Sequence, residues 1–268
     1  MTSSDTTDQP DARTSALTVD FASERGTRPT NQDAAEYAHH HTNGQPAHVV
    51  VAVADGMGSN SKSHLIAQAA VNLVTAIGHR RNYRTTPGEL IELARIVLPE
   101  MGRFIDGPHA AAFFDFDDEE PGRRPDTTLI VATVDLTGDI HASWYGDSRA
   151  YLLTRSGALH LLTRDHNEAE EFGGSPHVLT RSLAHPNGEP DNIHWPAHDN
   201  GDHAARLLLT TDGVHQPLTH TEIHAILREA PTPADAAQQL TIKAVAAAGD
   251  HADNATALVI DIPTDTQG

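Results

Sequence analysis

The sequence predicts an α+β fold, because its expected strands and helices fall into blocks instead of alternating one by one. Hydrophobic patterns along the 268 residues indicate a group of strands, two helices, a second group of strands, two more helices and a final strand. A repeated strand–helix–strand order would instead predict a parallel sheet. A chain of this length can bury about 75% of its unfolded surface, as one large domain or as two small ones.

The first half of the chain carries two expected strands and two expected helices. Apolar and polar residues alternate over 17–21, which is typical of a half-buried strand, and the Val-rich run 48–54 indicates a buried strand. Apolar residues at helical spacing predict amphipathic helices over 63–79 and from about 88 to 103. Residues 113–125 have no such periodicity, and we expect them to form a loop.

Four short β-rich runs follow, separated by turns that contain Gly, Asp or Ser. Because such short turns reverse the chain, the runs predict an antiparallel meander. No regular pattern is visible after Asp165 until a further strand, which two Ala-rich helices and a last strand follow. The expected meander strands are 127–134, 140–145, 150–154 and 159–162, and the later elements are strand 206–210, helices 221–229 and 234–248, and strand 255–262.

The net charge of the chain limits the kinds of molecule that it can bind. Its 37 Asp and Glu against 18 Lys and Arg give a net charge of -19, which repels phosphate backbones and anionic lipid headgroups. We therefore expect no nucleic-acid partner and no membrane partner. The absence of cysteine excludes disulfides, a cysteine nucleophile and a thiolate metal site.

Both ends of the chain are expected to lie outside the folded domain. Residues 1–15 are rich in Ser, Thr and Asp, and their few apolar side chains cannot offset the entropy of ordering, which predicts a disordered tail. The start lacks the pattern of a signal peptide, and no apolar run reaches the roughly 18 residues of a membrane span, which predicts a cytoplasmic protein. The domain is expected at 16–263, with a short tail at 264–268.

Four aspartates lie where an expected strand meets a turn: Asp55, Asp147, Asp212 and Asp253. Each alone is a common turn residue. Together, carboxylates at the tips of neighbouring strands can converge on one edge of a sheet, where their repulsion is tolerable only around a cation. Oxygen-only ligands favour Mg²⁺ or Mn²⁺ over Zn²⁺. A pair of such ions activates water and clamps a phosphoryl group, so the pattern indicates hydrolysis of a phosphate ester.

Seven short segments follow one another along the chain with a familiar order and spacing. They are Arg-Gly-Thr-Arg-Pro-Thr-Asn-Gln-Asp at 25–33, Asp-Gly-Met-Gly at 55–58, Asp-Thr-Thr-Leu at 126–129, Gly-Asp-Ser-Arg-Ala-Tyr-Leu at 146–152, Leu-Thr-Arg-Asp-His at 162–166, Thr-Asp-Gly at 211–213 and Asp-Asn-Ala-Thr at 253–256. This set resembles the ordered motifs of metal-dependent type-2C (PPM) Ser/Thr protein phosphatases of the bacterial type. The resemblance runs from about residue 16 to residue 262.

The resemblance implies a four-layer α/β/β/α sandwich of two antiparallel sheets flanked by helices, with a binuclear metal site at one end. The activity it implies is hydrolysis of phosphoserine and phosphothreonine on proteins by water activated between two Mn²⁺ or Mg²⁺ ions, with a third, weaker ion in bacterial members. The implied partner is a phosphorylated protein that a Ser/Thr kinase supplies. We expect the chain to act as a monomer.

The same resemblance assigns roles to individual residues. Asp55, Asp212 and Asp253 would form the catalytic centre: Asp55 would bridge both metals, and the other two would complete the second metal's ligands. Gly56 would offer its backbone carbonyl to the first metal, and Asp147 would hold the third ion together with Asp212.

Two further residues complete the implied site. Arg28, four residues before Gln32, would bind the substrate phosphate through its planar guanidinium. Asp33 would lie just behind the metal ligands without binding an ion itself.

The sequence departs from the family pattern at four places, one of which is Ser59 where a Gly is frequent. Gln32 stands where the family often has Glu, and Met57 stands where eukaryotic members carry a His that acts as general acid. The segment between His166 and Val178 is shorter than the usual flap over the substrate groove. These departures leave an alternative open, namely a catalytically weakened module that binds or senses a phosphoprotein.

The 19 histidines offer two further candidates. His39, His40 and His41 are consecutive, so their side chains diverge and cannot chelate one ion from regular structure, which predicts a solvated edge. His166, His215 and His251 lie near the motifs, and each is either a proton donor or an ordinary hydrogen-bonded residue at the rim of the site.

Overall fold

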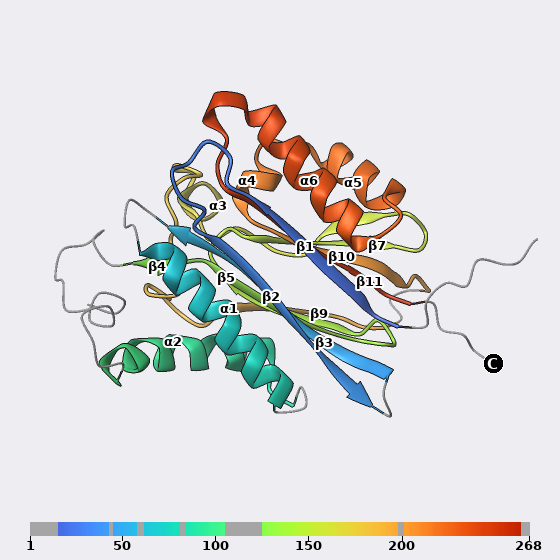
Figure 1. The fold of residues 1–268 in the computed structure, drawn as a ribbon, viewed down its shortest axis with the longest axis horizontal. Coiled ribbons are helices and arrows are strands. Elements are labelled where there is room, and N and C mark those ends of the chain that lie inside the picture. The colour runs from blue at the N-terminus through green and yellow to red at the C-terminus, as the bar shows by residue number, and fades with distance from the viewer. Residues whose placement is uncertain are drawn as a thin grey trace, which may run out of the picture.

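Two antiparallel sheets packed face to face form the centre of the molecule, and helices cover both outer faces (Figure 1). The computed structural model describes residues 16–42, 45–57, 62–80, 84–104, 125–197 and 201–263. This architecture confirms the predicted α+β class and the four-layer α/β/β/α sandwich. The expected tails 1–15 and 264–268, and the expected loop 113–125 except its last residue, lie outside the described residues.

Within the described part of the chain, one sheet has five strands in the order β1-β11-β10-β7-β8, and the other has six strands, of which β2-β3-β5-β6-β9 run side by side and β4 pairs with β3. The five-stranded sheet consists of β1 (Thr18–Glu24), β7 (Arg149–Thr154), β8 (Leu159–Leu161), β10 (Ala204–Thr210) and β11 (Ala255–Asp261). The six-stranded sheet consists of β2 (Asp33–Thr42), β3 (Gln45–Met57), β4 (Asp126–Thr127), β5 (Leu129–Asp135), β6 (Ile140–Tyr145) and β9 (Asp191–Trp195).

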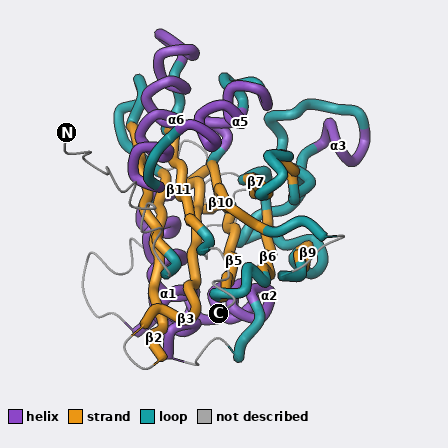
Figure 2. Tube along the Cα trace, turned by 90° about the vertical axis from the view of Figure 1, so that its right-hand side faces the viewer, coloured by secondary structure: helices purple, strands orange, loops and turns teal. Residues whose placement is uncertain are grey.

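The helices divide between the two outer faces. The long helices α1 (Ser63–Arg80) and α2 (Pro87–Phe104) cover the six-stranded sheet, and α4 (Asp212–His215), α5 (His220–Glu229) and α6 (Pro233–Ala248) cover the five-stranded sheet. Figure 2 shows these two layers above and below the strands, with the short helix α3 (Glu168–Phe172) standing out to one side. A 3₁₀ turn, η1 (Gly249–His251), leads from α6 into the last strand.

Strand β3 shows why the Val-rich run is apolar at every position. Val49, Val51 and Val53 face the core between the two sheets, whereas Val50 and Ala52 face the core under α1 and α2. All five side chains are fully buried. A strand with a layer on each face must be apolar on both, so an uninterrupted run replaces the alternation of a half-exposed strand.

The predicted meander is wrong in one respect. Strands β5 and β6 pair, and β7 and β8 pair, but β6 and β7 belong to different sheets. The turn between them begins at Gly146, which has a φ of +99°, and a Cβ there would lie 2.5 Å from Cγ2 of Thr128. A turn signal shows where a chain reverses but not which sheet receives the next strand, and here the turn carries the chain across the sandwich.

Each predicted strand and helix in the described residues is present within a few residues of its expected bounds. Strands β2 and β9, the short helices α3 and α4, and the 3₁₀ turn η1 were not predicted. In the described part of the chain, no helix combines the length and the apolar character that a membrane span needs.

Candidate active site

The structure brings the four strand-end aspartates together in one cleft. Asp55 lies two residues before the end of β3, Asp147 lies between β6 and β7, Asp212 opens α4 after β10, and Asp253 precedes β11. All four line a cavity of about 640 Å³, so both sheets contribute to it. Arg28 also lines this cavity.

Thr127, the last residue of β4, and Thr128 after it fix the backbone of Asp55. Its N–H donates to Oγ1 of Thr128 (2.9 Å), and its carbonyl accepts from the Thr128 N–H (2.9 Å) and from Oγ1 of Thr127 (2.8 Å). In the register of β2 and β3, Asp33 lies directly opposite Asp55. The motif 126–129 therefore holds the aspartate through hydrogen bonds that do not involve its carboxylate.

Gly56 is a glycine because backbone packs against it on both sides. Its N–H donates to the carbonyl of Gln32 (3.1 Å). A Cβ at this position would lie 2.6 Å from that carbonyl oxygen and 2.9 Å from the backbone of Ser63. Any side chain here would push the loop that carries Arg28 away from the end of β3.

A buried histidine fixes the backbone of Asp147. Nε2 of His215 donates to the carbonyl of Asp147 (3.1 Å). Burial, together with the charge of Arg149, lowers the pKa of His215 to about 3, so its ring is neutral at physiological pH. His215 thus acts as a fixed hydrogen-bond donor inside the fold.

Burial and crowding raise the pKa values of the carboxylates around the cleft. Burial is the largest cause at each, and the negative charges of the neighbouring aspartates add to it. The pKa values of Asp33 and Asp147 rise to about 7, that of Asp55 rises well above its ordinary value, and that of Asp212 is also raised. The cluster can lower its free energy either by holding protons or by holding cations.

The residues present fit divalent cations that prefer oxygen ligands. The four strand-end aspartates bring their carboxylates together in the cleft, and carboxylates suit Mg²⁺ and Mn²⁺. Oδ1 of Asp33 is buried and accepts no hydrogen bond from the described residues, which leaves an unsatisfied negative group just behind the cleft. Its other oxygen, Oδ2, accepts from Oγ1 of Thr211 (2.8 Å) and so ties Asp33 to the residue before Asp212.

Arg28 lies at the mouth of the cleft, in the loop between β1 and β2. Its Nη2 is 2.6 Å from Oδ2 of Asp253, and 57% of its side chain is exposed. Asn254 fixes this loop: its Nδ2 donates to the carbonyls of Arg25 (2.8 Å) and Thr30 (3.1 Å), and its Oδ1 accepts from the Gln32 N–H (2.8 Å).

The sequence analysis did not predict a second wall of the cleft. It comes from the irregular segment 177–185, which contributes Arg181, Ser182 and His185, and from Asp126, the first residue of β4. Oδ2 of Asp126 accepts from Oγ of Ser182 (2.5 Å) and lies 3.0 Å from Nδ1 of His185. Asp126 belongs to a recognised motif, but the segment 177–185 has no periodicity that would mark it.

The three histidine candidates do not line the cleft. His166 is buried, where its Nδ1 accepts from the Gly146 N–H (3.1 Å) and its Nε2 lies 3.2 Å from Asp191. His215 is the buried donor described above, and His251 is exposed in η1. The histidines on the cleft wall are His177 and His185.

A family model described as Protein phosphatase 2C matches residues 22–241. The chain belongs to this family. As a protein phosphatase of the 2C type it is a hydrolase of phosphorylated proteins, which confirms the resemblance seen in the motifs.

Bacterial Ser/Thr phosphatases are among the proteins similar to this chain. The serine/threonine phosphatase stp of Listeria monocytogenes (strain EGD-e) is 25% identical over 226 residues, which cover 79% of this chain and 84% of the relative. The crystal structure of the Mycobacterium tuberculosis phosphatase PstP superposes with a TM-score of 0.69 at 23% identity, over 92% of this chain and 99% of PstP. A structure of the PstP catalytic domain in complex with two manganese ions gives a TM-score of 0.68 at 24% identity, over 91% and 97% of the two chains.

Without metal, the phosphatase should lose stability as the pH rises from about 4 to about 7. Asp33 and Asp147 titrate at about 7 in the folded protein, whereas unfolded aspartates titrate near 3.8. Between these values the folded protein binds more protons than the unfolded chain, so a rise in pH favours unfolding. Thermal unfolding midpoints of the EDTA-treated protein across this range measure the effect.

Two variants identify the source of this pH dependence. Asp147→Asn removes one of the raised carboxyls, so its midpoint should fall less steeply with pH. Asp20→Asn removes an exposed aspartate of β1 and should leave the wild-type slope. An equal slope in wild type and Asp147→Asn would show that the carboxyl of Asp147 does not hold one of these protons.

Proposed function

We propose that this chain hydrolyses phosphoserine and phosphothreonine in proteins, with two Mn²⁺ or Mg²⁺ ions in the carboxylate cleft. The observation that carries the proposal is the convergence of Asp55, Asp212 and Asp253 beside Arg28 in one cavity. The proposed ligands of the two ions are these three carboxylates and the carbonyl of Gly56. Asp147 would join Asp212 in holding a third ion.

Bound ions of this kind would lower the pKa of a water molecule and neutralise charge on the phosphoryl group. The role of the surrounding residues is to fix the aspartates in position without forming hydrogen bonds to the carboxylate oxygens that would bind the ions. Thr127 and Thr128 do this for Asp55 through its backbone, and His215 does it for Asp147 in the same way.

Arg28 is proposed to bind the substrate phosphate. A guanidinium has five N–H donors in a rigid fork, and the contact with Asp253 occupies one side of it. The rest of this exposed side chain is available to a phosphate that enters the cleft. The same contact keeps the guanidinium next to a proposed metal ligand, so the phosphate oxygens and the ions would share one small volume.

Two cleft residues favour a second candidate, a phosphatase-like module that binds phosphoproteins with little turnover. Gln32 and Met57 both line the cavity, where relatives of the family often have an acid and eukaryotic members carry a proton-donating His. Neither residue can supply a negative charge, and Met57 has no proton to give. Turnover of a phosphothreonine peptide and of p-nitrophenyl phosphate with Mn²⁺ separates the two candidates.

Asp212→Asn should lower kcat by about 100-fold or more on both substrates, because it removes a ligand oxygen that the ions require. It should also raise the thermal stability of the metal-free protein near pH 8, since one buried negative charge is gone, and this shows that the variant folds. Asp20→Asn is the matched control and should keep wild-type activity. Near-normal turnover by Asp212→Asn would contradict the metal assignment, and no turnover by the wild type would favour the binding module.

Arg28→Ala should raise KM by roughly 10-fold to 100-fold, since hydrogen bonds to a charged group contribute about 1.5–3 kcal/mol. Arg28→Lys should recover little of this, because a point charge cannot replace the planar fork. Arg164→Ala removes an exposed arginine outside the cleft and serves as the control. Steady-state kinetics on the phosphothreonine peptide decide the matter, and a wild-type KM in Arg28→Ala would exclude the phosphate-binding role.

A further inference from the structure

A second group of possible metal ligands lies at the other end of strand β6 from the cleft. Asp139 directly precedes β6, whereas Asp147 follows it, so the strand separates the two groups. His141 in β6 and His194 in β9 complete the group. Within the described residues, these three side chains offer ligand atoms that all lie within 4.8 Å of one another.

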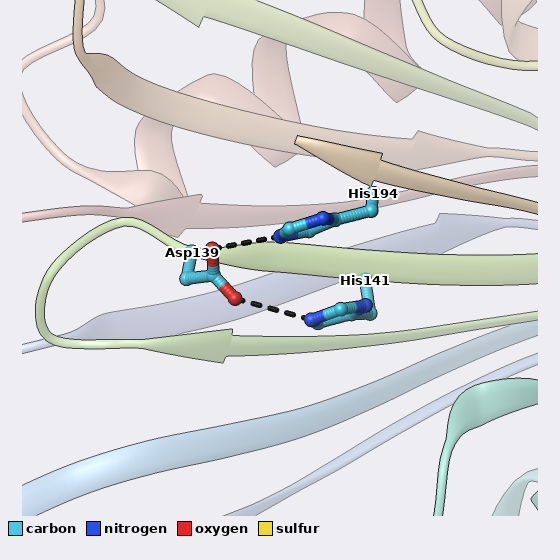
Figure 3. A group of neighbouring side chains, drawn as sticks. All are labelled: Asp139, His141 and His194. Carbon is cyan, nitrogen blue, oxygen red and sulfur yellow. Dashed lines mark hydrogen bonds and ion pairs between the residues drawn. The ribbon is translucent and has the colours of Figure 1, made fainter. Parts of the chain in front are cut away.

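The two imidazole rings present the same edge to one carboxylate (Figure 3). Nε2 of His194 is 2.8 Å from Oδ1 of Asp139, and Nε2 of His141 is 3.1 Å from Oδ2. The rings are stacked, with centroids 4.1 Å apart and planes 1° from parallel. Both nitrogens therefore face the same small volume.

The sheet itself produces this arrangement. His141 and His194 are direct partners in the antiparallel register of β6 and β9, so their side chains leave the same face at the same level. Their neighbours Ile140 and Ile193 pack toward the core between the sheets, which fixes the histidines on the outer face. The pairing register thus sets the separation of the rings.

A separate hydrogen-bonded turn fixes Asp139. Oδ1 of Asp135 accepts from the N–H (2.8 Å) and Oγ1 (2.6 Å) of Thr137 and from the N–H of Asp139 (3.0 Å). Burial opposes ionisation of Asp139, but hydrogen bonds and charge from His194 and His141 outweigh it and lower the pKa of Asp139. The carboxylate is therefore charged and held at the position where both rings meet it.

We propose that Asp139, His141 and His194 bind Zn²⁺ in a site distinct from the carboxylate cleft. Two imidazole nitrogens and one carboxylate are a ligand set that Zn²⁺ accepts, with water in the fourth position. Mg²⁺ and Mn²⁺ prefer the oxygen ligands of the cleft, so the two sites select different ions. About half of each histidine side chain is exposed, which leaves the fourth position open to solvent.

Rotation of the two exposed rings about their side-chain torsions, which tilts their parallel Nε2 lone pairs toward one point, would convert the observed contacts into metal ligation. A neutral imidazole carries one ring proton, and with that proton on Nδ1 the Nε2 atom is free to bind a metal. Zinc ligands at about 2.0–2.2 Å in a tetrahedron lie roughly 3.4 Å from one another, and the three side chains already approach this spacing. A bound ion would link the hairpin at 135–139 to β9. This edge strand follows the cleft-wall segment 177–185 along the chain.

Zinc binding is tested on the full chain in excess Mg²⁺, which occupies the oxygen site. Competition with a chromophoric zinc chelator should reveal one Zn²⁺ per chain in the wild type. The double variant His141→Gln, His194→Gln should lose about 10-fold or more in affinity for that ion, because a glutamine amide can still donate to Asp139 but binds zinc poorly. Zn²⁺ should also raise the thermal midpoint of the wild type and not of this variant.

A matched control removes two histidines elsewhere. His39→Gln, His41→Gln takes away two rings from one face of β2, 6.1 Å apart, and should bind Zn²⁺ as the wild type does. The single variant His194→Gln repeats the test with a smaller change to the sheet. Wild-type zinc affinity in the double variant and in the single variant His194→Gln would overturn the proposal. An equal loss of zinc affinity in the β2 control would also overturn it.

Discussion

Repulsion among aspartates that share one cleft is the constraint on which the rest of the site depends. Burial raises the pKa values of Asp33, Asp55, Asp147 and Asp212, and the negative charges of neighbouring aspartates add to the effect. Such a cluster persists only if the surrounding structure is rigid and if protons or cations compensate the charge. The three apolar cores supply the rigidity, because the cleft sits at the end of strands whose side chains are buried on both faces.

The contacts around the cleft follow from this constraint. Thr127, Thr128 and His215 hold the aspartates through backbone atoms, which leaves the carboxylates to other partners. Asn254 holds the loop of Arg28 in the same manner, through three backbone groups. Asp139 at the far end of β6 differs from the cleft aspartates, because two imidazoles contact its carboxylate directly.

Much of the fold and one side of the site could be predicted from the sequence. Aspartates at strand ends, glycine-containing turns and long amphipathic helices are local signals, and they located Asp55, Asp147, Asp212 and Asp253 as well as α1, α2, α5 and α6. The assignment of β6 and β7 to different sheets is not local, because it depends on what each strand packs against. The edge position predicted for His39–His41 is confirmed, since β2 is the outermost strand of its sheet, but the predicted solvation holds only for His41, because His39 and His40 are half-buried.

The wall at 177–185 could not be predicted, because tertiary contacts rather than periodicity hold it. Backbone bonds from Thr180 to His166 (2.9 Å) and from Leu183 to Thr127 (3.0 Å) fix it over the cleft. Strand β9 escaped notice for a similar reason. Its five residues lie at a sheet edge, and only two of them, Ile193 and Trp195, pack on the core.

The most direct test of the account is a crystal structure of the protein soaked in Mn²⁺, with anomalous scattering recorded to place the ions. The account predicts two strong anomalous peaks in the cleft, one of them in contact with both Asp212 and Asp253 and both in contact with Asp55. Arg28 should remain at the mouth of the cleft beside them. An empty cleft at a Mn²⁺ concentration that supports activity, or ions bound away from these carboxylates, would contradict the central claim.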